Sequence, residues 1–128
     1  MIYAEEMREK QKSILKAFEH YIDGQNFFDI VYSRKNGYLM IDSPSAGCAE
    51  RLDTPEKMLG ALFNEVITDV VLSPENTARM CDAPALTKWE ETEIRRRLTA
   101  ILKTIGDGGA EYLDFLDAYI KAYRERYR

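Results

Sequence analysis

The sequence is poor in the residues from which metal and nucleophile sites are built. Its 128 residues include one histidine, His20, and two cysteines, Cys48 and Cys81, which lie far apart in the chain. No Cys-x-x-Cys pair, His-Glu-x-x-His motif or calcium loop occurs, so we expect no metal site and no cofactor. In a reducing compartment we expect both cysteines to be free thiols.

Long apolar runs and an excess of positive charge are also absent. No stretch approaches the roughly 20 apolar residues that cross a bilayer, and the opening MIYAEEMREKQK lacks the basic start and apolar centre of a signal peptide. The net charge is -4 and the pI is about 5.1, which argues against a broad surface for nucleic acid or membrane. We therefore expect a cytoplasmic protein with neither of these partners.

Apolar residues in helical spacing are abundant, and residues 54–72 show the clearest pattern. Apolar doublets recur there every four residues, which predicts a helix with a broad buried face. Thr54 can cap this helix, Pro55 suits its first position and Glu56 favours its positive end. The doublets are Met58/Leu59, Leu62/Phe63, Val66/Ile67 and Val70/Val71. We expect this to be the central helix on which the other elements pack.

Three further long stretches have helical spacing. They cover residues 2–22, in which Gln11 interrupts the apolar stripe, residues 88–105 and residues 110–127. Thr87 and Glu90 form a capping box for the second, and glycines within residues 106–109 predict a tight turn to the third. A shorter helix is expected from residue 74 to about residue 81.

Two β-branched and aromatic runs flank Asn36-Gly37, a sequence typical of a two-residue type I′ hairpin turn. In the register that this turn implies, Tyr32 faces Ile41. The core face of the hairpin would then carry Phe28, Ile30, Tyr32, Leu39 and Ile41. Residues 42–53 are predicted to be a loop. Two strands leave two unpaired edges, which either helices cover or a second copy of the chain extends.

The fold class that follows is α+β and mostly helical, in a single domain of residues 1–128. Its order is an N-terminal helix, a β-hairpin, a buried central helix, a short helix and a C-terminal helical hairpin. The chain shows no internal repeat and no linker long enough to divide it.

Two groups of residues are candidates for chemistry, and each has a simpler interpretation. Cys48, with His20 as base and Asp42 as the orienting carboxylate, would suit a thiol enzyme, but the spacing does not enforce that geometry. The basic run at residues 95–97 would suit phosphate contacts. Glu91 and Glu93, however, precede these arginines at spacings that favour intrahelical ion pairs. We assign no catalytic residue.

Eight tyrosines are more than a small core requires, and tyrosine is common at interfaces and pocket mouths. Our first hypothesis is a non-enzymatic interaction or regulatory protein that forms a homodimer or binds another protein. Its interface would include Tyr112, Tyr119, Tyr123 and Tyr127. The alternative is a small-ligand binding module with a pocket between the hairpin, residues 43–53 and the central helix. That pocket would be lined by Tyr32, Tyr38, Met40 and Phe63.

Overall fold

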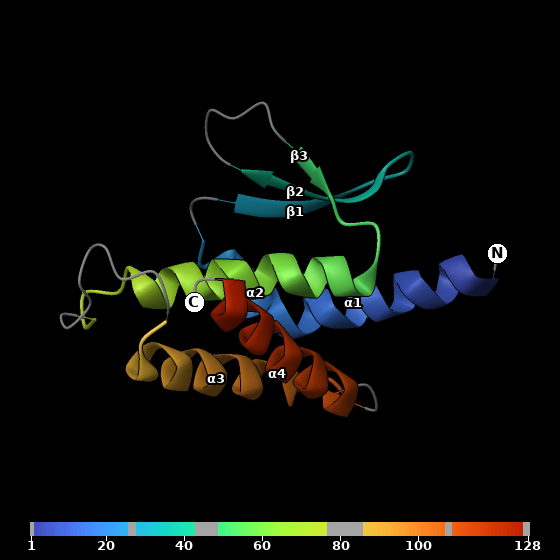
Figure 1. Ribbon diagram of the computed structural model, residues 1–128. Coiled ribbons are helices and arrows are strands. Elements are labelled where there is room, and N and C mark those ends of the chain that lie inside the picture. The colour runs from blue at the N-terminus through green and yellow to red at the C-terminus, as the bar shows by residue number, and fades with distance from the viewer. Residues whose placement is uncertain (1, 26–27, 43–48, 77–85, 107–108, 127–128) are drawn as a thin grey trace. The chain divides into compact units, whose positions relative to one another are not determined.

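The structure is a computed structural model that describes residues 2–25, 28–42, 49–76, 86–106 and 109–126. Its helices and strands in these ranges confirm the predicted α+β, mostly helical fold (Figure 1). The elements are α1 (Ile2–Asp23), β1 (Phe28–Ser33), β2 (Gly37–Asp42), β3 (Ala49–Arg51), α2 (Pro55–Val71), α3 (Lys88–Leu102) and α4 (Gly109–Arg126). The chain divides into two compact units, Met1–Leu59 and Gly60–Arg128. No observation here tests the predicted single domain.

The first unit packs α1 against one face of an antiparallel sheet with the strand order β1-β2-β3. Ile14 and Phe18 of α1 are fully buried, and Phe28 and Met40 are the buried residues of the strands. Tyr21 of α1 contacts the Phe28 ring, with 6.4 Å between the ring centroids. Ile14, Phe18 and Tyr21 all belong to the apolar stripe read from the sequence, and through Tyr21 that stripe contacts the sheet.

The hairpin register differs from the predicted one. Tyr32 pairs with Tyr38, and the strands are joined through residues 34–36. A type I′ turn needs positive φ at both Asn36 and Gly37, but only Gly37 has it (φ 73°), and no described residue other than glycine does. The Ser33 hydroxyl accepts hydrogen bonds from the amides of Lys35 and Asn36, both at 3.3 Å. This hydroxyl stabilises the longer loop and so moves the register.

The altered register also changes the faces of the sheet. The face toward α1 carries Phe28, Ile30, Tyr32, Tyr38 and Met40 rather than the set expected. The observed partner of Tyr32 is an odd number of residues away from the predicted one, and such a shift moves the side chains of one strand to the opposite face relative to the other. Leu39 and Ile41 thus lie on the other face. The predicted loop at residues 42–53 is partly wrong as well, since residues 49–51 form β3 against β2. Residues 43–48 lie outside the described residues.

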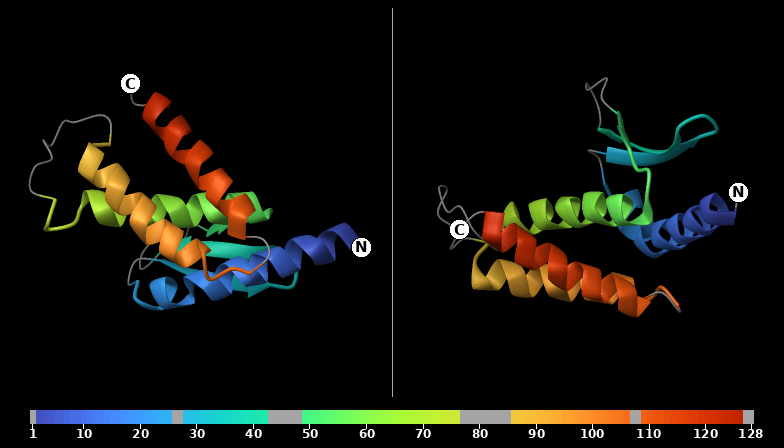
Figure 2. Two further views of the ribbon diagram at one scale, coloured as in Figure 1. Left: turned by 90° about the horizontal axis from the view of Figure 1, so that it is seen from below. Right: turned by 45° about the vertical axis from the view of Figure 1, so that its right-hand side comes forward.

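The second unit contains most of α2 together with α3 and α4. The apolar doublets of α2 are buried as predicted, except that Val71 is only half-buried. Within the second unit, the Phe63 ring contacts those of Phe115 and Tyr119 at 5.7 and 5.5 Å between centroids. Figure 2 shows α3 and α4 running in opposite directions. Arg95 of α3 donates to Asp117 of α4, and Arg124 of α4 donates to Glu91 of α3. These two ion pairs join the predicted helical hairpin.

Helix ends follow the sequence signals closely. The Thr54 hydroxyl accepts from the Lys57 amide at 3.0 Å, and the capping box of Thr87 and Glu90 is present. α3 ends at Leu102, three residues before the predicted end. Of the short helix expected from residue 74, residues 77–81 lie outside the described residues, and the Asn76 amide closes a turn on the Ser73 carbonyl.

Candidate functional site

A pocket of about 200 Å³ lies between α1 and the hairpin, and we call it the α1–hairpin pocket. All of its lining residues belong to the first unit. They are Met7, Arg8, Gln11, Tyr32, Gly37, Tyr38 and Asp53. Residues 7, 8 and 11 share one face of a helix, and the direct pairing of Tyr32 with Tyr38 places both rings on the side of the sheet toward α1.

Aromatic rings and one cation form the mouth of this pocket. The Tyr32 and Tyr38 rings meet edge to face with centroids 5.1 Å apart. The Arg8 guanidinium carbon lies 5.4 Å from the centroid of the Tyr32 ring, which is a cation–π distance. Among the described residues, no carboxylate forms an ion pair with Arg8. Its charge is therefore held by an aromatic face and left available to an anion.

The other polar groups of the pocket have partners. Gln11 is buried and its side-chain amide donates to the Leu52 carbonyl at 2.7 Å, which fixes the side chain in place. The Asp53 carboxylate oxygens lie 3.6 Å from the Nε atom of Arg51 and 3.8 Å from the Nζ atom of Lys57, so two cations offset the charge of Asp53. The net electrostatic character of the pocket is thus set by Arg8.

The opposite face of the sheet carries a group of neighbouring apolar side chains, Val31, Leu39 and Ile41, which we call the outer patch. Val31 pairs with Leu39, and Ile41 follows Leu39 on the same face of β2. Val31 is 36% exposed and Ile41 38% exposed, although strand residues with apolar side chains usually pack against a second layer. On this face the outer patch lies between Asp29 on β1 and Arg51 on β3.

The two edges of the sheet are protected. Because the Tyr38 carbonyl accepts from the Leu52 amide, alternate pairing places the Ile30 amide on the side of β1 away from β2. On that side the Ile30 amide donates a hydrogen bond to the Asp29 carboxylate, with 2.8 Å between nitrogen and oxygen. At the other edge β3 has three residues, of which Glu50 and Arg51 are charged. Short edges and edge charges are devices that prevent strand addition.

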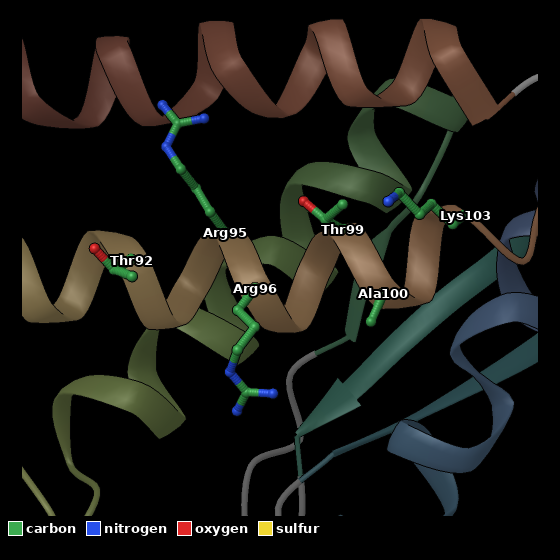
Figure 3. A pocket seen from close by; sticks show the side chains of 6 residues that line it. All are labelled: Thr92, Arg95, Arg96, Thr99, Ala100 and Lys103. Carbon is green, nitrogen blue, oxygen red and sulfur yellow. The ribbon is translucent and has the colours of Figure 1, made fainter.

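A second, more open hollow of about 520 Å³ lies along α3 (Figure 3). It is lined by Thr92, Arg95, Arg96, Thr99, Ala100 and Lys103. Figure 3 shows Arg95 extending toward α4, where Asp117 binds it, and Arg96 extending to the other side of α3. Of the three cations that line this hollow, Arg95 is paired with Asp117 and Arg96 with Glu93.

Glu93 neutralises the rest of the basic run. Its carboxylate accepts from the Nε atoms of Arg96 at 3.1 Å and Arg97 at 3.0 Å. Hydrogen bonds from Arg96 first and Arg97 second lower the pKa of Glu93 from 4.5 to about 2. The predicted pairs of Glu93 are therefore confirmed. The predicted pair of Glu91 with Arg95 is wrong, because each binds a residue of α4 instead.

The residues proposed from sequence as a ligand pocket are only partly together. Tyr32 and Tyr38 line the α1–hairpin pocket, and Met40 is buried on the same face of the sheet without lining it. Phe63 lies in the second unit, in the cluster with Phe115 and Tyr119. The sequence did not identify Arg8, Gln11 and Asp53 as lining residues of this pocket. The break that Gln11 makes in the apolar stripe was the available signal.

The tyrosines proposed as an interface have varied surroundings. Tyr112 is buried, and the Tyr119 hydroxyl donates toward the Gly60 carbonyl and contacts the Asn64 side-chain oxygen. Tyr123 is half-buried, and Tyr127 lies outside the described residues. The ring and hydroxyl of Tyr119 are thus used within the second unit.

Little of the proposed thiol chemistry falls within the described residues. His20 is exposed near the end of α1, while Cys48 and the side chain of Asp42 lie outside the described part. Within the described ranges, no group of three or more histidine, cysteine, aspartate or glutamate side chains is placed to hold a metal ion. No helix there combines the length and apolar character needed to cross a membrane.

Comparison of the chain with protein families, with curated proteins and with solved structures found no match in any of the three.

Proposed function

We propose that this chain is a small, non-enzymatic interaction protein of the cytoplasm whose copies pair through the outer patch of the sheet. The observation that carries the proposal is the half-exposed state of Val31 and Ile41 on either side of Leu39. Burying such side chains contributes about 25 cal/mol for each Å² removed from water. No described element of the first unit covers this face.

Pairing through the face is favoured over strand addition at an edge. Asp29 covers the Ile30 amide, and a second copy adding to β1 would have to displace that carboxylate. At β3, a strand of three residues offers few backbone groups to a partner. The apolar face has no comparable obstacle.

The charges beside the outer patch favour a second copy as the occupant. Asp29 and Arg51 lie on opposite outer strands, one beside Ile41 and the other beside Leu39. A two-fold axis presents the same surface twice, so a paired copy can place its Arg51 against Asp29 of the first. The Nε atom of Arg51 lies 3.6 Å from Asp53 of its own chain, and the other guanidinium nitrogens are the ones that would meet Asp29. The surface is thereby complementary to itself in charge and in apolar character.

The experiment is sedimentation velocity over a range of protein concentrations for the wild type and two variants. Ile41→Glu introduces a charge into the outer patch and is expected to give a monomer. The matched control, Leu72→Glu, changes a residue that is 75% exposed beyond the end of α2 and is expected to leave the dimer intact. Circular dichroism checks that each variant is folded. A wild type that stays monomeric at tens of micromolar, or an Ile41→Glu variant that dimerises as the wild type does, would refute the proposal.

A further inference from the structure

We infer that the α1–hairpin pocket binds a small aromatic carboxylate, with its anionic group on Arg8 and its ring against Tyr32 and Tyr38. This site is separate from the outer patch, because Tyr32 and Tyr38 point to the α1 side of the sheet and the outer patch to the other. Both can therefore be occupied in one molecule, and each can be tested without the other.

The charges of the pocket select an anion. Asp53 is offset by Arg51 and Lys57, whereas Arg8 has no ionic partner among the described residues. A guanidinium donates two parallel hydrogen bonds to a carboxylate, a geometry that a neutral amide cannot match. The Tyr32 ring holds the Arg8 guanidinium on one side, so the cation is oriented before a ligand arrives.

The rings and the size of the pocket select a planar molecule with one ring. Tyr32 keeps 46% of its surface exposed while it contacts Tyr38 and Arg8. An edge-to-face tyrosine pair leaves ring surface on which another aromatic group can pack. The volume of about 200 Å³ is below the roughly 300–1,000 Å³ of pockets for larger ligands.

Gln11 supplies a second polar group to the lining of the pocket. Its amide nitrogen is used by the Leu52 carbonyl, so its oxygen is the atom that can accept from a ligand hydroxyl. A ring that carries both a carboxylate and a hydroxyl, such as 4-hydroxybenzoate, offers one group to Arg8 and one to Gln11.

The test is an amide NMR titration of the whole chain with 4-hydroxybenzoate and with 4-hydroxybenzamide. The two probes have the same shape and differ in charge. We expect saturable shifts for the carboxylate, centred on residues 7–11, Tyr32 and Tyr38, and affinity at least about tenfold weaker for the amide, because the ionic bond to Arg8 is lost.

Two variants assign the charge to one side chain. Arg8→Met is expected to weaken 4-hydroxybenzoate binding about tenfold or more and to abolish the preference over the amide. The matched control, Lys16→Met, removes an exposed cation two turns further along the same helix that does not line the pocket, and it should leave both the affinity and the preference unchanged. The absence of saturable shifts with 4-hydroxybenzoate, or equal affinity of the wild type for both probes, would overturn the inference. The probe comparison uses the wild type alone and so holds even if Arg8→Met fails to fold.

Discussion

At the scale of single residues, the buried carboxylate of Glu90 shows which polar contacts can be read from the sequence and which cannot. Glu90 is fully buried, where it accepts from the Thr87 amide at 2.8 Å and from the Asn76 side chain at 2.6 Å. The capping box is visible in the sequence because both of its residues lie within one turn. The bond to Asn76 was not predictable, since 14 positions separate the two residues and no local pattern connects them.

Glu93 allows a prediction about pH. Its pKa is about 2 in the folded protein and 4.5 ordinarily, so the folded state binds the proton less well than the unfolded state. The carboxylate therefore stabilises the fold above about pH 4.5, and this contribution is lost as the pH falls toward 2. We expect Glu93→Gln to lower the free energy of unfolding by about 1 kcal/mol at neutral pH, the upper range for such surface ion pairs. Urea unfolding at several pH values measures the difference.

The control for this prediction is Glu125→Gln, which neutralises an exposed carboxylate on α4. Its free energy of unfolding should stay near that of the wild type at every pH. A Glu93→Gln difference that is the same at pH 7 and near pH 2 would contradict the assignment, because a protonated Glu93 and a glutamine carry the same charge.

At the scale of elements, the helices were predictable and the sheet was predictable only in outline. Helix signals are local: the doublets of α2, Thr54 and the box at Thr87 all act within a few residues. The hairpin was also found, but its register depends on a choice between two turns that the same Asn36-Gly37 pair permits. β3 was missed because three residues with a charged majority have no strand pattern until β2 lies beside them.

The turn gives a prediction with a closely matched control. A Cβ atom added at Gly37 or at Gly106 would meet nothing within 4 Å, but only Gly37 has positive φ. Gly37→Ala should therefore lower the free energy of unfolding by about 1 kcal/mol through backbone strain. Gly106→Ala should change it little or raise it by about 0.5 kcal/mol, because alanine reduces the entropy of the unfolded chain. Thermal unfolding followed by circular dichroism measures both, and equal losses would show that φ is not the cause.

The candidate site shows the same division between local and long-range information. Tyr32 and Tyr38 are close in sequence, but only the observed register places both on the face toward α1, since the predicted register put Tyr38 on the face opposite Tyr32. Arg8 and Gln11 come from a helix more than twenty residues earlier, and Asp53 from beyond β3. Nothing in their spacing connects them with the tyrosines until α1 packs on the sheet.

At the scale of the whole molecule, pairing of two copies couples stability to protein concentration. If the folded chain pairs through the outer patch and the unfolded chain does not, mass action raises the unfolding midpoint as the concentration rises. For a dimer of chains of this length, we expect a rise of about 2–3 °C for each tenfold increase. Differential scanning calorimetry across at least two decades of concentration measures this slope.

The slope distinguishes pairing from an effect on a single chain. Ile41→Glu should have a midpoint that does not depend on concentration and that lies below the wild type at high concentration, where the wild type is paired. Leu72→Glu should keep the wild-type slope, because its side chain lies outside the outer patch. A wild-type midpoint that is constant with concentration would refute pairing, yet it would leave the α1–hairpin pocket untouched, since ligand binding there requires a single copy of the chain.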